Sequence, residues 1–231
     1  ALRILEGIDW KKVRIFHMDE YIGIDPSHPA SFPLFLENHF LQFIKPGHFH
    51  PIPSKPSDVS AACKEYESLI RQYPADLVAM GWGENGHIAF NEPGSSLESR
   101  TRIKTLAYDT IVANSRFFDD DLSQVPKMAL TVGVRTVMDA REVLIIITGF
   151  NKAMALHMCV EEGVNHMWTV SAIQEHPKAI LVCDEDATME LKVKTVRYFK
   201  ALKATTEVLQ KVSGAADGEE ETAKKKRAKH S

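Results

Sequence analysis

The chain has 231 residues, of which 44% are hydrophobic and 26% charged, a typical profile for a globular protein with one main core. Its 28 lysines and arginines against 31 aspartates and glutamates give a formal charge of −3, so no basic field favours nucleic acid as a partner. The longest apolar run, around Val143 to Thr148, is far shorter than the ~20 residues that a membrane span needs.

The cysteines and the start of the chain indicate the compartment. Cys63, Cys159 and Cys183 are odd in number and far apart, which provides neither a disulfide framework nor a C-x-x-C motif. We therefore expect a reducing, cytoplasmic environment. Because the sequence starts at Ala1 and has no signal-peptide pattern, we also expect a fragment or a processed product.

Short apolar runs typical of strands alternate along the chain with amphipathic segments typical of helices. The expected strands are 13–16, 76–80, 128–132, 142–148 and 179–183, and the expected helices are 31–44, 58–73, 152–162 and 188–212. This alternation predicts an α/β protein with a mostly parallel sheet and helices on both faces.

The domain organisation follows from where this pattern stops. Residues 1–212 are expected to form one domain, and residues 213–231 contain no large apolar side chain whose burial could offset the entropy of ordering. We expect this charged tail to be disordered. Its basic run, Lys224 to Lys229, is interpreted as a solvated chain end rather than as a targeting signal.

The first candidate site is His17-Met18-Asp19-Glu20-Tyr21, which directly follows an expected strand. Ligands of open α/β sheets bind at the carboxyl ends of the strands, so this acidic pair is expected to face a crevice. Adjacent side chains point in different directions, which predicts that only one of Asp19 and Glu20 is a working group. The alternative is that either carboxylate caps a turn or pairs with a lysine.

The second candidate is the glycine-rich segment 81–93 after another expected strand. Its glycines allow close approach of the backbone to a ligand and expose amide groups. His87 can move protons near neutral pH, and Glu92 could orient it; a tight connection with a surface histidine is the alternative. The glycines match G-x-G-x-x-G, but Asn91-Glu92-Pro93-Gly94 would stop any helix here, so a dinucleotide site is not expected.

The third candidate is a scattered set of basic residues, which are Arg100, Arg102, Lys104, Arg116 and Lys152. Lys152 falls at an expected helix start after a strand, where an ammonium group and a helix N-terminus together suit a phosphate. Each residue could also be an ordinary surface charge. Together with the acidic pair and the glycine-rich segment, they favour a small phosphorylated substrate.

At this point several segments resemble one family, the glucosamine-6-phosphate deaminases, also called glucosamine-6-phosphate isomerases. The likeness runs from about Val13 to Phe199. The segments that carry it are 17–23, 86–97, 112–119, 163–169 and 183–188. The resemblance implies a Rossmann-like α/β fold and the conversion of glucosamine 6-phosphate and water to fructose 6-phosphate and ammonia, without a metal or an organic cofactor.

The resemblance also implies roles for single residues. Asp19 matches the aspartate that moves a proton between C2 and C1 of the open-chain sugar, His87 the acid and base that opens the pyranose ring, and Glu92 its carboxylate partner. Arg116 and Lys152 match ligands of the 6-phosphate.

A second set of matching residues implies regulation. Ser95, Arg102 and Lys104 match a cluster that recognises the phosphate of an activator, N-acetylglucosamine 6-phosphate, in the hexameric members of the family. A homo-oligomer is therefore expected.

The sequence departs from the family pattern in four respects. The usual chain begins upstream with a strand and a Gly-Ser/Thr-Pro phosphate loop, so we expect this sequence to lack them and to bind phosphate weakly without them. Asn85 stands beside the histidine where many members have aspartate, which should lower the pKa of His87 and keep its hydrogen bond. Met80 and Trp82 replace smaller residues, and Arg135 replaces a usual glycine.

Two alternatives remain beside the deaminase interpretation. A 6-phosphogluconolactonase shares the architecture and the glycine-rich loop but lacks the Met-Asp-Glu-Tyr and Phe-Asn-Glu-Pro stretches. A non-catalytic, sugar-phosphate-binding relative is motivated by the missing phosphate loop and by the departures at Met80, Trp82 and Arg135.

Overall fold

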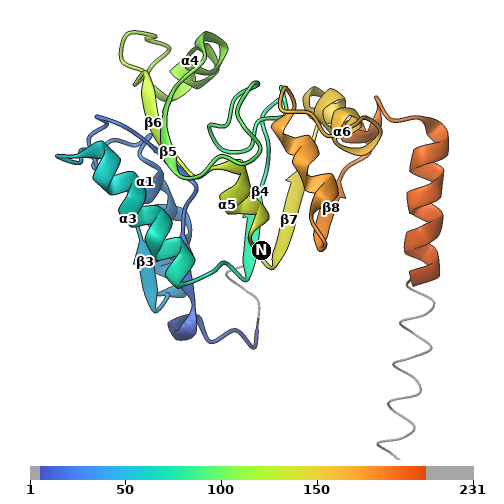
Figure 1. Ribbon diagram of the computed structural model, residues 1–231, viewed down its shortest axis with the longest axis horizontal. Helices are drawn as coiled ribbons and strands as arrows, with labels where there is room; N and C mark the ends of the chain where they lie inside the picture. The colour runs from blue at the N-terminus through green and yellow to red at the C-terminus, as the bar shows by residue number, and fades with distance from the viewer. Residues whose placement is uncertain (1–5, 207–231) are drawn as a thin grey trace, which may run out of the picture. The chain divides into compact units, whose positions relative to one another are not determined.

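The computed structural model describes residues 6–206, which fall into two compact units divided after Met189. The first unit contains all the strands of the described chain (Figure 1). In the second, residues 193–206 form a helix. The rest of the expected helix to 212 and the expected tail at 213–231 lie outside the described residues.

Three small sheets make up the first unit. The largest parallel one has the order β4-β7-β8, whose strands lie side by side in Figure 1. A parallel pair joins β1 to β3, and an antiparallel sheet has the order β2-β6-β5. The bounds are β1 Arg14–Phe16, β2 Asp19–Tyr21, β3 His48–His50, β4 Leu77–Met80, β5 Arg102–Thr105, β6 Met128–Thr131, β7 Glu142–Ile147 and β8 Ala179–Cys183.

Helices and single turns connect these strands. The helices are α1 Phe32–Leu36, α2 Gln42–Ile44, α3 Val59–Gln72, α4 Tyr108–Asn114, α5 Val134–Met138 and α6 Ala153–Val160. The remaining helical segments have 3-10 or π geometry and are η2 Trp10–Lys12, η3 Glu37–Leu41, η4 Ser115–Phe117, η5 Phe150–Lys152, η6 Thr169–Glu175 and η7 Asp186–Thr188. Asp58 begins α3 by accepting a hydrogen bond from the Ala61 amide, as an N-cap aspartate does.

The α/β class and all five expected strands are confirmed to within one or two residues. One detail differs, because β6 was expected in a parallel sheet but pairs antiparallel with β2 and β5. The strands β2, β3 and β5 were not expected, since each has only three or four residues and carries charged or imidazole side chains. The expected helix 31–44 is also interrupted, by the wider π turn of η3.

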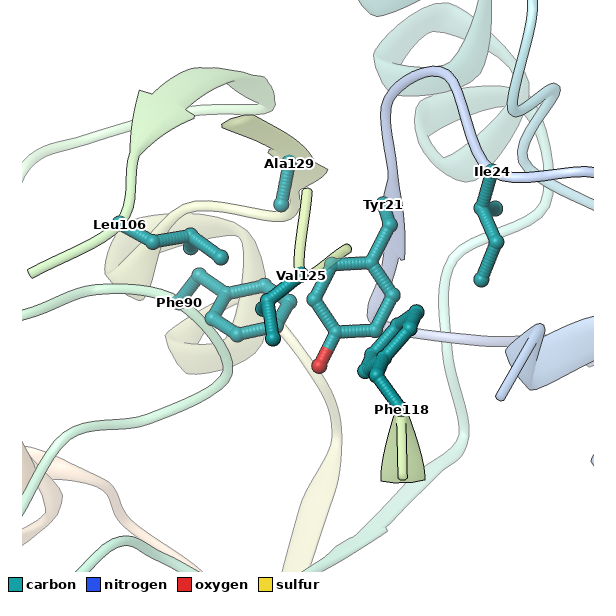
Figure 2. Packing of buried hydrophobic residues seen from close by; sticks show 7 residues of the cluster. All are labelled: Tyr21, Ile24, Phe90, Leu106, Phe118, Val125 and Ala129. Atoms are coloured by element: carbon teal, nitrogen blue, oxygen red, sulfur yellow. The ribbon is translucent and has the colours of Figure 1, made fainter. Parts of the chain in front are cut away.

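A cluster of buried side chains next to the antiparallel sheet connects segments that are distant in sequence. Tyr21 of β2 packs against Phe90 and against Phe118, with ring centroids 5.5 and 5.8 Å apart. Figure 2 shows these rings together with Ile24, Leu106, Val125 and Ala129. The cluster therefore fixes the end of the glycine-rich segment and the chain after η4 against β2.

No helix within residues 6–206 is long and apolar enough to cross a membrane.

Candidate active site

The two adjacent carboxylates after β1 have different surroundings, as their neighbouring positions on β2 predict. Glu20 is fully buried, and its carboxylate accepts hydrogen bonds from Ser31 Oγ at 2.8 Å and from the amides of Tyr21 and Phe32. The last of these is the first amide of α1, so Glu20 acts as a side-chain cap for that helix. Glu20 is thus held in a structural role, and Asp19 is left for chemistry.

The Asp19 carboxyl has an unusual proton affinity. Burial raises its pKa from the ordinary 3.8 to about 7, and the nearby negative charge of Glu20 acts in the same direction. The backbone of Asp19 is fixed by pairing with Thr131 of β6, and the amide of Val132 donates to Met18 O at 2.8 Å. A carboxyl group that titrates near neutral pH on a fixed strand can both accept and return a proton.

The glycine-rich segment is a compact turn that supports the ring of His87. A Cβ atom built on Gly83 would lie 2.1 Å from His87 Cε1, so the imidazole packs directly on the glycine. The amide of Gly83 donates to His87 O, and that of Gly86 donates to Gly83 O. The expectation that these two amides face a ligand is therefore wrong, because the turn itself uses them.

A chain of hydrogen bonds connects His87 to Glu92 through Asn85. His87 Nδ1 lies 2.6 Å from Asn85 Oδ1, and Asn85 Nδ2 donates to Glu92 Oε2 at 3.3 Å. The direct separation of His87 Nδ1 from Glu92 Oε2 is longer, 3.7 Å. The other carboxylate oxygen of Glu92 accepts a hydrogen bond from the hydroxyl of Thr110. Glu92 therefore orients the histidine mainly through the Asn85 amide.

This arrangement selects one tautomer of His87. Asn85 Oδ1 can only accept, so Nδ1 carries a proton and Nε2 of the neutral ring keeps its lone pair. The pKa of His87 is lowered, mainly by burial; Glu92 opposes this shift and Lys152 adds to it. The expected hydrogen bond to Asn85 is confirmed, although burial is the main cause of the lowered pKa.

Two cations approach each other beside this loop. The pKa of Lys152 is lowered first by burial; the negative charge of Glu84 opposes this shift, and the positive charge of Arg116 adds to it. Among the described residues, neither side chain forms an ion pair with a carboxylate. Two unpaired cations close enough to repel each other would be stabilised by a shared anion such as a phosphate.

The segment that carries Lys152 is held by its neighbours. Asp184 accepts hydrogen bonds from the amide of Gly149 at 3.0 and 3.1 Å, which fixes the chain just after β7. Asn151 Nδ2 donates to Glu84 Oε1 at 2.7 Å and so joins η5 to the glycine-rich segment. Lys152 then stands at the N-cap position of α6, as the sequence predicted.

The three residues matched to an activator site are placed on neighbouring segments. Ser95 is buried, and its hydroxyl has no hydrogen-bond partner in the described chain. Arg102 and Lys104 lie two positions apart on β5. The guanidinium of Arg102 already donates to Asn91 Oδ1 at 2.8 Å, and among residues 6–206 no hydrogen bond joins any two of the three side chains. Their role as a cluster stays a prediction.

The departures from the family pattern lie in different places. Met80 and Trp82 are 8% and 7% exposed, so both are core residues next to the glycine-rich segment. The side chain of Arg135 is exposed on α5 and pairs with Asp139 at 2.9 Å. The close backbone approach in this segment is at Gly133, where a Cβ would lie 2.0 Å from Ser99 O.

Sequence reasoning missed three threonines that support the site. Thr110 donates to Glu92, while Thr131 Oγ1 accepts from the Phe90 amide at 3.2 Å. Thr169 Oγ1 accepts from the amide of Ile88 at 3.2 Å and lies 3.0 Å from Asn91 O. Each lies 18 or more residues from its partner, so no local pattern marks it.

Comparisons with known proteins identify relatives of this chain. A family described as "Glucosamine-6-phosphate isomerases/6-phosphogluconolactonase" matches residues 2–182. The chain is 57% identical to glucosamine-6-phosphate deaminase 2 of Homo sapiens over 198 residues, which are 84% of this chain and 72% of the human protein. It is 58% identical to glucosamine-6-phosphate deaminase 1 of Mesocricetus auratus, covering 84% and 68% of the two chains.

Solved structures extend the likeness to three dimensions. A monomeric glucosamine-6-phosphate deaminase is similar with a TM-score of 0.72 and 32% identity, over 76% of this chain and 73% of the other. The 6-phosphogluconolactonase of Trypanosoma brucei has a TM-score of 0.61 at 15% identity, over 77% and 73% of the chains. At that identity the second likeness shows the shared fold alone.

Proposed function

The chain belongs to the family of glucosamine-6-phosphate isomerases and 6-phosphogluconolactonases, and we propose that it catalyses the isomerising deamination of glucosamine 6-phosphate. The products are fructose 6-phosphate and ammonia, with water as the second substrate. The high identity to curated deaminases over 84% of the chain supports this reaction over the lactonase reaction.

The 6-phosphate is bound by Lys152 and Arg116. Their unpaired charges are close enough to interact, and α6 directs its first amides toward the same end. Binding a dianion there relieves the repulsion between the two cations. Lys152 also lowers the pKa of His87, which places the phosphate subsite near the group that opens the ring.

Ring opening is the task of His87. Its Nε2 lone pair takes the proton of the C1 hydroxyl and returns a proton to the ring oxygen, while Nδ1 stays hydrogen-bonded to Asn85. The positive charge that forms on the imidazole is stabilised by Glu92, which acts through the Asn85 amide. A neutral ring at rest is what this step requires, and the lowered pKa of His87 supplies it.

Proton transfer between carbons is the task of Asp19. The carboxylate removes the proton from C2 of the open-chain sugar and returns it to C1, while the C1 oxygen gains a proton and the amino group loses one, which leaves an imine at C2. Water then adds to C2 and ammonia leaves, giving the ketose. A carboxyl pKa of about 7 suits both halves, because the group takes up and releases a proton with little change in free energy.

The observation that carries the proposal is the presence of two proton-transfer groups of different chemistry. Asp19 is a carboxyl with its pKa raised to about 7, and His87 is a neutral imidazole in a fixed tautomer. A lactonase needs no base for a C–H proton, and a binding protein needs neither group. The alternatives therefore leave the unusual environment of Asp19 without a purpose.

The finer features of the family are also proposed here. We infer a cytoplasmic enzyme of amino-sugar catabolism that forms a homo-oligomer and responds to N-acetylglucosamine 6-phosphate through Ser95, Arg102 and Lys104. Light scattering measures the oligomer, and a shift of the substrate saturation curve on adding the acetylated sugar phosphate measures activation. A monomer with an unshifted curve would contradict both.

The main test is ammonia release from glucosamine 6-phosphate by the purified protein, with fructose 6-phosphate measured in the same samples. Equal amounts of the two products are expected, together with no hydrolysis of 6-phosphogluconolactone. The variant Asp19→Asn should release little ammonia, and Asp76→Asn, on an exposed ion pair with Arg141, serves as the matched control. Lactone hydrolysis without ammonia release would reverse the assignment.

A further inference from the structure

His17 lies where the chain passes from one sheet to another. It follows β1, which pairs only with β3 in the described chain, and it precedes by two residues the Asp19 that opens β2. Only Met18 separates them. On this side of Asp19, opposite its pairing with β6, the chain is held by His17 at the end of β1.

The backbone of His17 is fixed by a hydroxyl from α3. Its amide donates to Tyr66 Oη at 3.1 Å, and the same hydroxyl lies 2.9 Å from His17 O and 3.2 Å from His50 O. Tyr66 is 5% exposed, and burial is the main cause of its raised pKa. The negative charge of Asp19 raises the pKa of Tyr66 further, which places the phenol near the Asp19 carboxyl. One hydroxyl thus connects the ends of β1 and β3.

The ring of His17 continues this connection. Its Nε2 lies 2.7 Å from the amide of Ile52, two residues beyond the end of β3. An amide can only donate, so Nε2 accepts and the proton of the neutral ring is on Nδ1. Burial lowers the pKa of His17 to about 4, which keeps the ring neutral at neutral pH.

The other ring nitrogen of His17 is not used by these contacts. Nδ1 of His17 is buried and has no hydrogen-bond partner within residues 6–206. The main chain of Asp19 acts on the imidazole and opposes the effect of burial on its pKa, which places that main chain against the ring. A protonated Nδ1 therefore has the Asp19 backbone as its natural acceptor.

We propose that His17 is the positioning residue for the Asp19 carboxylate, clamped by Ile52 and Tyr66 and presenting its Nδ1–H to the Asp19 main chain. The proposal rests on the deaminase function proposed above, in which Asp19 moves the proton between C2 and C1. Displacing a base by about 1 Å costs on the order of 10²-fold in rate, whereas phosphate binding at Lys152 does not depend on this junction.

The experiment compares His17→Leu, His17→Gln and Tyr66→Phe with the unmodified protein. Leucine removes the acceptor for Ile52, glutamine retains one, and Tyr66→Phe loosens the backbone of His17 while keeping the aromatic ring. We expect kcat for ammonia release to fall about 10- to 100-fold in His17→Leu and about 10-fold in Tyr66→Phe. KM should change less than about 3-fold, and His17→Gln should recover most of kcat.

His176→Leu is the matched control. His176 is also a histidine 7% exposed, and its ring nitrogens lie 2.9 Å from Ala140 O and 3.0 Å from the Lys178 amide. Its loss should lower the melting temperature, as the loss of His17 does, but leave kcat of the folded protein unchanged. This separates a positioning effect from a general loss of stability.

A second readout does not depend on turnover. The pKa of the Asp19 carboxyl, measured by carbon-13 NMR, should stay near 7 in His17→Gln and His176→Leu and fall by about one pH unit or more in His17→Leu or Tyr66→Phe, as water reaches the group. An unchanged pKa and an unchanged kcat in both of the latter variants would overturn the proposal. If the pKa falls but the unmodified protein releases no ammonia, the deaminase function fails and the positioning role stands.

Discussion

Replacing Asp19 by asparagine is expected to stabilise the protein while removing its activity. In the folded protein the carboxyl pKa is raised from 3.8 to about 7, so the fold prefers the protonated form. A carboxyl whose pKa is raised by folding contributes most stability below its unfolded pKa, and that contribution is lost as the pH rises to the folded pKa. Above about pH 7, ionised Asp19 therefore destabilises the fold.

The size of this effect follows from the two pKa values. Each tenfold change in the acid dissociation constant corresponds to about 1.4 kcal/mol. The fold is therefore destabilised by ionisation of Asp19 by at most about 4 kcal/mol at pH 8 and about 2 kcal/mol at pH 5. Because Asp19 is partly exposed, we expect about half of these values. Asparagine has nearly the same shape and does not ionise, so the variant should gain this free energy of unfolding.

Urea unfolding of both proteins between pH 5 and pH 8 measures the difference, and ammonia release measures turnover. The stability gain of Asp19→Asn should grow with pH up to about 7 and then level off, while kcat falls about 10²-fold or more. Asp76→Asn should change neither quantity appreciably. If the unfolding free energies of Asp19→Asn and the unmodified protein run parallel over this range, the carboxyl is not held with a raised pKa and the reasoning is wrong.

Three further predictions concern the rest of the site. Gly83→Ala should lower kcat about 10-fold or more, since the alanine Cβ would occupy the place of the His87 ring. Equal activity in a variant shown to be folded would refute the packing of His87 on Gly83. Lys152→Met should raise KM at least 10-fold in steady-state assays, because a charge-assisted bond to phosphate contributes about 1.5–3 kcal/mol, and an unchanged KM would place the phosphate elsewhere. Folding lowers the pKa of His17 from 6.5 to about 4. Its protonation should therefore lower the free energy of unfolding by up to about 3 kcal/mol as the pH drops from 6.5 to 4. Urea unfolding in the Asp19→Asn background should show this slope, and His17→Gln should remove it.

The sequence determined the features that depend on local order. The α/β class followed from the alternation of apolar periods, because a period of two or of 3.6 residues decides which face of an element is apolar before any tertiary contact forms. The different surroundings of Asp19 and Glu20 followed from their adjacency. The bond between Asn85 and His87 spans two residues in a tight turn and was likewise predictable.

The tertiary structure decided the contacts that close long loops. The hydroxyl of Thr110 on Glu92, the approach of Arg116 to Lys152, and the clamp of Ile52 on His17 each join residues separated by 18 to 36 positions. Strand pairing is of the same kind, and the polar three-residue β2 exists because β6 offers it a partner. Such contacts form because many individually weak packing interactions, such as that between Tyr21 and Phe118, together bring the segments into contact. The sequence of one segment alone does not determine the total free energy of these interactions.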